Sequence, residues 1–178
     1  VGFGKGFLGT NNESPRDKAI LGDRGNLYCI DEKTGEFLWQ LIVPKLGARK
    51  VSDWEYVGIC SSPAIEKDRL WLITNRGEVV CLDMNGMADG NDGPFKDEGK
   101  YMADNGKPPV AVKKTDADII WVLNMIDECG VFPHNITSCS VMIVGDQIWT
   151  STSNGVDYGH VDTPAPNAPA MIVVDKKT

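Results

Sequence analysis

Histidine is almost absent from this sequence, which has two in 178 residues, His134 and His160. So few imidazoles leave little material for acid–base catalysis or for a histidine-rich metal site. The sequence also lacks a G-x-S-x-G segment, which marks the nucleophile of α/β-hydrolases. No apolar run is long enough to form a membrane-spanning helix. We therefore expect no hydrolase chemistry, and no membrane span in this segment.

Positive charge is also in short supply. The 18 Lys and Arg residues are outnumbered by 25 Asp and Glu residues, which gives a formal net charge of -7. The basic residues are scattered, whereas nucleic-acid binders cluster them against phosphates. With 42% hydrophobic and 24% charged residues, the composition is that of a soluble globular protein. A length of 178 residues corresponds to about one domain, and the charge predicts no nucleic-acid partner.

The cysteines form no recognisable metal or redox motif. There is no C-x-x-C pair, no zinc-type spacing and no haem-attachment pattern. Their number is odd, so at least one thiol must remain free in any intramolecular pairing scheme. The five positions are Cys29, Cys60, Cys81, Cys129 and Cys139.

Internal similarity is the strongest signal in the sequence. Segment 61–86 can be laid over segment 139–155 without a gap as far as Gly77, and segment 4–12 repeats part of the same unit. The strands "LYCID", "VVCLD" and "MIVVD" also align, each ending on Asp before a turn. The matched positions are Ile65 with Ile143, Asp68 with Asp146, Trp71 with Trp149, and Thr10 and Thr74 with Thr152.

Alternating apolar residues bounded by turn residues predict an all-β fold. One short helix is expected within 124–130, ended by glycine. Short strands in a repeated four-strand unit favour the blades of a β-propeller; a β-sandwich is the alternative, although it needs no copies of one motif. The predicted strands are 5–10, 26–31, 36–42, 62–65, 68–75, 78–83, 119–123, 140–143, 147–151 and 170–175.

The segment "GNLYCIDEKTGEFLW" has the composition of two strands joined by a rigid corner. Asp31 can accept backbone N–H groups across the turn, and the Thr34 hydroxyl can add a further bond. Gly35 permits a positive φ that would strain a residue with a Cβ atom. Cys29 is expected to be a small buried hydrophobe, and Trp39 a large buried ring.

This spacing resembles the docking motif A-x-D-x-x-T-G-x-x-x-W of the PQQ-like (quinoprotein-type) β-propellers, with Cys29 in the alanine position. The resemblance implies that Trp39 wedges between neighbouring blades. It also implies blade repeats near 1–42, 60–123 and 138–178, with an insertion at 84–118. The second copy retains Cys81, Asp83 and Gly86 with a delayed Trp121, and the third retains Val173, Asp175 and Thr178.

Two functions follow from the resemblance. The first is a non-catalytic scaffold or binding module, periplasmic or otherwise exported, with mostly reduced cysteines. The alternative is part of a PQQ-dependent alcohol or sugar dehydrogenase, in which PQQ and Ca²⁺ would be the cofactors. Some members hold the quinone against a disulfide between adjacent cysteines, and this sequence has no adjacent pair. That departure favours the scaffold.

The insertion is rich in oxygen ligands of the kind that Ca²⁺ takes, although no register fits an EF-hand loop. A solvated acidic loop is the alternative. The candidate ligands are Asp83, Asn85, Asp89, Asn91 and Asp92, and Asp97 and Glu98 supply further carboxylates in the same segment.

A candidate binding surface precedes the strand predicted at 140–143, which would face the axial funnel of a propeller. It consists of His134, Asn135 and Cys139. A second insertion, 153–170, carries Asp157, His160 and Asp162 and three prolines. We expect it to cover one mouth of the propeller; a transition-metal site is the alternative.

Counted by repeat, the predicted strands number three, four and three. That is about two and a half blades, whereas a propeller of this type closes with four to eight. The sequence therefore predicts that further blades complete the ring, either in a longer gene product or in partner chains.

Overall fold

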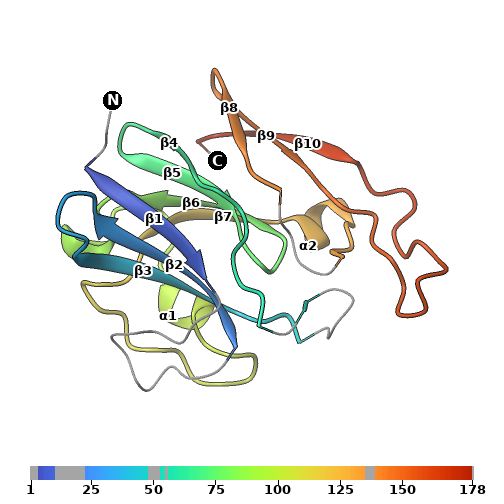
Figure 1. The fold of residues 1–178 in the computed structure, drawn as a ribbon, viewed down its shortest axis with the longest axis horizontal. Helices are drawn as coiled ribbons and strands as arrows, with labels where there is room; N and C mark the ends of the chain where they lie inside the picture. The colour runs from blue at the N-terminus through green and yellow to red at the C-terminus, as the bar shows by residue number, and fades with distance from the viewer. Residues whose placement is uncertain (1–3, 11–22, 48–52, 55, 135–138, 178) are drawn as a thin grey trace.

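The computed structural model describes residues 4–10, 23–47, 53–54, 56–134 and 139–177. In this part of the chain ten strands form three antiparallel sheets, which lie side by side in chain order (Figure 1). Sheet 1 contains β1 (Lys5–Thr10), β2 (Arg24–Asp31) and β3 (Phe37–Pro44). Sheet 2 contains β4 (Ala64–Glu66), β5 (Arg69–Ile73), β6 (Glu78–Asp83) and β7 (Ile119–Asn124). Sheet 3 contains β8 (Met142–Val144), β9 (Gln147–Ser151) and β10 (Met171–Asp175).

The all-β prediction is confirmed, and each predicted strand has a counterpart in the three sheets. Two of them, β4 and β8, begin two residues later than predicted. The residues just before these two strands make hydrogen bonds outside the strand pairing. The Ser61 hydroxyl accepts the Ile73 N–H at 3.1 Å, and the Ser62 N–H donates to the Ser140 hydroxyl at 3.0 Å. The segments that enter β4 and β8 therefore touch each other before either strand begins.

The short helix α2 (Met125–Cys129) is also where the sequence predicts it. The Asn124 side chain caps it by accepting the Ile126 N–H at 3.0 Å, and Gly130 ends it with a φ of 64°. Two further helical turns, η1 (Gly86–Ala88) and α1 (Glu98–Tyr101), lie in the insertion and were not predicted. No helix in the described ranges combines the length and the apolar character needed to cross a membrane.

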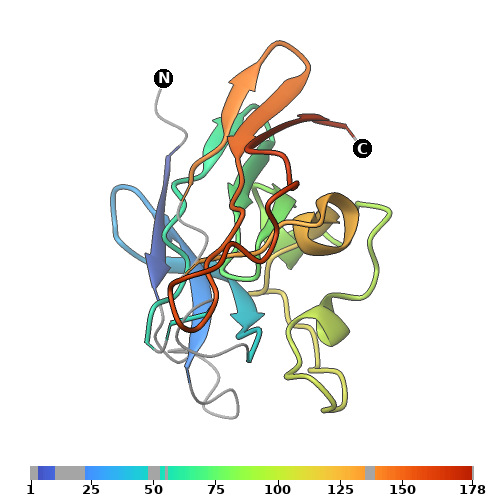
Figure 2. The same cartoon turned by 90° about the vertical axis from the view of Figure 1, so that its right-hand side faces the viewer.

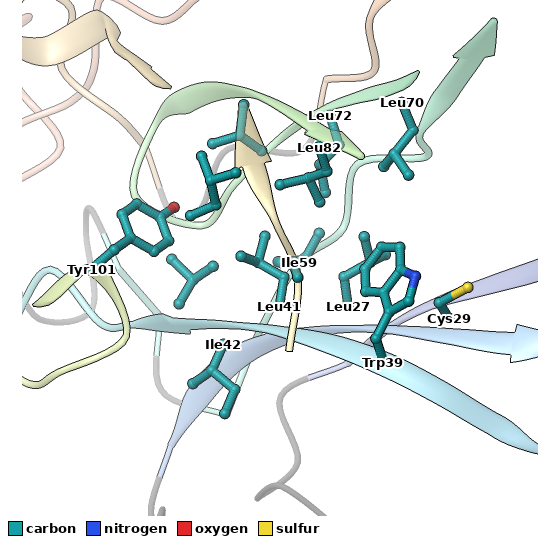
Figure 3. Packing of buried hydrophobic residues seen from close by; sticks show 14 of the residues in the cluster. Leu27, Cys29, Trp39, Leu41, Ile42, Ile59, Leu70, Leu72, Leu82 and Tyr101 are labelled. Carbon is teal, nitrogen blue, oxygen red and sulfur yellow. The ribbon is translucent and has the colours of Figure 1, made fainter. Parts of the chain in front are cut away.

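Sheet 2 is covered by sheet 1 on one face and by sheet 3 on the other. Side chains alternate along its strands, so successive residues contact different neighbouring sheets. Leu70, Leu72 and Leu82 pack with residues of sheet 1, such as Leu27 and Leu41 (Figure 3). The intervening residues of the same strands, Trp71, Ile73, Val79 and Cys81, pack with Ile148 and other residues of sheet 3. Its strands therefore carry almost unbroken apolar runs, as expected for a sheet covered on both sides.

The insertion covers part of the core rather than standing apart in solvent. Tyr101 and Met102 are buried and belong to the cluster between sheets 1 and 2. A short stretch of the insertion also pairs with the outer edge of β3: the Gln40 N–H donates to the Thr115 oxygen at 3.0 Å, and the Ala117 N–H donates to the Gln40 oxygen at 2.7 Å. This pairing occupies an edge that would otherwise present free backbone groups. Figure 2 shows α1 and α2 on the same side of the molecule.

One backbone hydrogen bond between neighbouring strands occurs at the equivalent place in all three sheets. The residue after each aligned Asp, namely Glu32, Met84 or Lys176, donates its N–H to a carbonyl oxygen at the start of a neighbouring strand. The acceptors are Gly4, Asp68 and Asp146, and the distance is 3.0 Å in all three cases. Gly4, Asp68 and Asp146 are also the positions that the sequence alignment brings into register.

All five cysteines carry free thiols. Cys29 and Cys81 are buried at matching positions of β2 and β6, and each pairs across its sheet with a tryptophan. Burial raises the pKa of the Cys29 thiol to about 11 and that of Cys81 to about 12. Cys60 is exposed.

We expect the thiols to differ sharply in reactivity, because the thiolate is the reactive form. In native protein at neutral pH, iodoacetamide should modify Cys60 first and leave Cys29 and Cys81 unmodified until the chain unfolds. Peptide mass spectrometry after timed alkylation measures this order. Unfolding without reductant should release all five thiols. A lower count would show that a disulfide forms.

Candidate functional site

The most regular feature of the structure is the hairpin corner that begins at Asp31. Its Oδ1 accepts the Lys33 N–H at 2.9 Å, the Thr34 N–H at 2.8 Å and the Thr34 hydroxyl at 3.0 Å. The Thr34 hydroxyl in turn accepts the Glu36 N–H at 3.2 Å. Gly35 has a φ of 70°. The bonds expected from the sequence are therefore present, and the hydrogen bonds from Thr34 and Lys33 lower the pKa of Asp31.

One bond of this corner, from the aspartate carboxylate to the N–H two residues later, recurs at the other two aligned aspartates. Asp83 Oδ1 accepts the Asn85 N–H at 2.7 Å, and Asp175 Oδ1 accepts the Lys177 N–H at 2.8 Å. Unlike the exposed corner at Asp31, the corner at Asp83 is buried, and the Asp83 carboxylate is bound to Arg69. Burial raises the pKa of Asp83, and the Asn85 N–H and Arg69 lower it in part.

The insertion begins at the second corner, and the strands on either side of it pair as those beside the first corner do. In the first hairpin, the Asp31 N–H donates to the Glu36 carbonyl oxygen at 2.8 Å. In the second hairpin, the Asp83 N–H donates to the Asp118 carbonyl oxygen at 3.0 Å. Trp39 lies three residues after Glu36, and Trp121 lies three residues after Asp118. Trp121 pairs with Cys81 in register, as Trp39 pairs with Cys29. Trp121 therefore occupies the position expected of the delayed tryptophan.

Each of these tryptophans binds the next sheet through the same kind of bond. Trp39 is 1% exposed, and its Nε1–H donates to the Met84 carbonyl oxygen at 3.0 Å. The Trp121 Nε1–H donates to the Lys176 carbonyl oxygen at 3.3 Å. Met84 and Lys176 each follow the aspartate of the next corner. The indole of one sheet is thus bonded to the corner of the next (Figure 3 shows the Trp39 ring in the core).

Close packing fixes the position of the Trp39 ring. The Phe7 ring lies against it, with 5.9 Å between the ring centroids. On another side is Gly86, where an added Cβ would lie 2.8 Å from Trp39 Cγ and 2.7 Å from the Asp116 carbonyl oxygen. Only a residue without a side chain fits there. Gly86 also has a positive φ of 59°.

The candidate funnel residues are placed in two separate settings. His134 is half-buried beside His160 of the second insertion, and their ring centroids are 5.7 Å apart in an edge-to-face arrangement. Cys139 is bound to β9 instead: its thiol donates to the Ser151 oxygen at 2.9 Å and accepts the Thr150 hydroxyl at 3.4 Å. Asn135 lies outside the described residues.

The approach of the two histidines was not predicted, because they lie in loops for which the alignment offers no match. His134 Nδ1 is buried and makes no hydrogen bond within the described residues. Asp157, in the same loop as His160, accepts the N–H groups of Val161 and Asp162 at 2.6 and 2.7 Å. These bonds lower its pKa and hold the loop in a tight turn.

The five predicted calcium ligands are engaged in several different contacts. Asn85 bonds to Asp89 Oδ2 at 2.8 Å and accepts Lys5 Nζ at 3.0 Å. Asn91 accepts Lys96 Nζ through its carbonyl and side-chain oxygens. Across the described ranges, no three His, Cys, Asp or Glu side chains converge as a metal-binding group. Calcium binding by Asp83, Asn85, Asp89, Asn91 and Asp92 stays a prediction.

We expect Trp39→Ala to lower the free energy of unfolding by about 3 to 5 kcal/mol, the usual cost of truncating a buried aromatic residue. The loss removes both the ring packing and the bond to Met84. The matched control is Trp54→Ala, since Trp54 is 43% exposed and should contribute about 0.5 kcal/mol or less. Urea unfolding followed by circular dichroism measures both. Equal stability of the two variants would show that Trp39 does not join the sheets.

A glycine pair separates backbone strain from packing on Trp39. Gly35→Ala and Gly86→Ala both force alanine into a positive φ, at a cost of about 1 to 2 kcal/mol. Space is open around Gly35, whereas the new methyl group at Gly86 meets the indole. Gly86→Ala should therefore cost about 1 to 3 kcal/mol more than Gly35→Ala. The same unfolding assay measures the difference, and equal losses would contradict the close contact with Trp39.

No protein-family model matches the chain, and no curated protein matches it. What the chain does must therefore follow from its own contacts. The recurring corners and the tryptophan bonds between sheets are the most regular of these.

Proposed function

We propose that this chain is part of a PQQ-like β-propeller that acts as a non-catalytic scaffold or binding module outside the cytoplasm. The observation that carries the proposal is the repeated indole-to-carbonyl bond, from Trp39 to Met84 and from Trp121 to Lys176. A bond that recurs at equivalent positions along the chain holds successive sheets in a similar relation to one another. Radial stacking of small antiparallel sheets is the arrangement of propeller blades.

The open face of sheet 3 supports further blades. Val173 is the aligned counterpart of Cys29 and Cys81, both of which are buried by the next sheet. Val173 itself is 44% exposed, and it lies beside Trp149, which pairs in turn with Met142. These side chains form a continuous apolar row across the three strands. By equivalence with sheets 1 and 2, the occupant that fits this row is another antiparallel sheet of the same kind, from this gene product or a partner chain.

A structural role for the recurring residues supports a scaffold rather than an enzyme. The Asp31 carboxylate and the Thr34 hydroxyl are used within their own corner, and the Trp39 indole is used against the next sheet. The groups that the resemblance matches are thus committed to holding sheets together. Ligand binding would fall to the loops around the sheets, such as the region where His134 meets His160.

The proposal is tested by the solution behaviour of the chain. An apolar row without its neighbouring sheet should promote association, so sedimentation velocity should show complexes that grow with concentration. Val173→Lys should shift the chain toward monomer. Val112→Lys is the control, because Val112 is equally exposed (43%) but lies on the insertion. A stable monomer at all concentrations that is unaffected by Val173→Lys would overturn the propeller proposal.

The dehydrogenase alternative needs its own test. PQQ and Ca²⁺ added to the protein should leave the quinone absorbance unchanged, and alcohols and sugars should not be oxidised with an artificial electron acceptor. Saturable quinone binding together with turnover would replace the scaffold by a quinoprotein dehydrogenase. This result is independent of the sedimentation test, which concerns only the fold.

A further inference from the structure

Two carboxylates of the insertion are buried next to sheet 2. Glu98 is the first residue of α1 and is 2% exposed, and Asp118 precedes β7 and is 0% exposed. A loop closes over them: the Asp92 N–H donates to Asp118 Oδ2 at 2.9 Å. Gly93 packs so tightly that an added Cβ would lie 2.8 Å from Ile120 Cα. The two acidic groups are therefore enclosed between this loop, α1 and the start of β7.

Each carboxylate leaves one oxygen without a donor. Glu98 Oε1 and Asp118 Oδ1 are both fully buried, and neither accepts a hydrogen bond from the described residues. Burial raises the pKa of Glu98; hydrogen bonds from Asn91 and from the Ile119 N–H lower it, and the charge of Asp118 raises it. Burial likewise raises the pKa of Asp118, opposed by the Asp92 N–H, while the charges of Asp83 and Asp92 raise it further. Two neighbouring buried carboxylates need either a proton or a cation between them.

The basic side chains nearby do not fill this need. Lys96 lowers the pKa of Asp118, but its exposed ammonium group is bound to the two oxygens of Asn91 at 2.5 and 2.6 Å. Arg69 and Lys5 are bound at the neighbouring corner, to Asp83 and Asn85. The free oxygens of Glu98 and Asp118 thus have no cationic partner among these side chains.

We propose that Glu98 Oε1 and Asp118 Oδ1 are ligands of a Ca²⁺ ion that fastens the insertion to sheet 2. Both are hard oxygen donors, and Ca²⁺ accepts six to eight of them in irregular geometry, with loop oxygens and water completing the shell. Mg²⁺ fits less well because it requires near-octahedral geometry and keeps its waters. Two carboxylates supply little charge, so the expected Kd is about 10⁻⁴ to 10⁻³ M.

The first test compares the purified protein with Ca²⁺ and with chelator. Calcium at about 10 mM, in excess of the expected Kd, should raise the Tm by about 3 to 6 °C relative to EGTA. Mg²⁺ at the same concentration should have little effect. Calorimetric titration should give one Ca²⁺ site per chain. If Ca²⁺ neither binds nor changes the Tm, the proposal is wrong.

Isosteric variants locate the site. Glu98→Gln and Asp118→Asn should each weaken Ca²⁺ binding by about tenfold or more and remove the Tm shift. The controls are Asp97→Asn, an exposed neighbour of Glu98, and Asp89→Asn, which belongs to the other group of candidate ligands. Both controls should retain the Tm shift. Loss of Ca²⁺ binding in Asp89→Asn, with binding kept in Glu98→Gln, would move the site away from the buried pair.

A third variant keeps both carboxylates and so avoids any loss of the fold. Lys96→Met removes the ammonium group that lowers the pKa of Asp118 and should tighten Ca²⁺ binding severalfold, because the ion no longer competes with that positive charge. The control Lys107→Met removes an exposed charge elsewhere on the insertion. Unchanged or weaker binding in Lys96→Met would also overturn the proposal. None of these results depends on whether the sheets belong to a propeller.

Discussion

The contact of the Trp39 indole with the next corner is the interaction on which the arrangement of sheets 1 and 2 depends. A flat ring of this size stabilises the fold mainly through its burial, and its single polar group must find a partner when water is excluded. The Met84 carbonyl oxygen supplies that partner at 3.0 Å. Because the acceptor belongs to the turn of the next sheet, the bond fixes orientation as well as distance. Trp121 makes the same kind of bond between sheets 2 and 3.

The rigidity of the corners explains why the tryptophan contact recurs between both pairs of neighbouring sheets. A carbonyl oxygen is a useful docking point only if the turn that carries it does not move. In the corner at Asp83, the carboxylate holds the Asn85 N–H and is itself held by Arg69, so Met84 is fixed between two constrained residues. Gly86 then allows the backbone to approach the ring to van der Waals contact. Capping, backbone conformation and core packing therefore favour the same geometry, which is the consistency expected of a well-specified fold.

The insertion shows how a long segment is added without disturbing this frame. It leaves sheet 2 after Asp83 and returns at Asp118, and the bond between those two residues closes the hairpin as a short turn would. The added residues contribute Tyr101 to the core, and a short stretch pairs with the edge of β3. Glu98 and Asp118 are the exception to this favourable packing, because each buries a carboxylate with one oxygen that accepts no hydrogen bond from the described residues, and such burial opposes folding. Such local conflicts are often found at functional or ligand-binding positions.

The sequence by itself determined the strands, the first corner and the position of α2, because these depend on residues close together in the chain. Alternating apolar residues define a strand, and Asp31, Thr34 and Gly35 define a turn, whatever surrounds them. The helical turns of the insertion were not predicted, since three or four residues are too few to show a helical period. Only the tertiary structure decided that His160 reaches His134 and that Glu98 and Asp118 are buried together. Each of these pairs residues across a long or unmatched loop, and no local preference encodes which distant group a loop brings near.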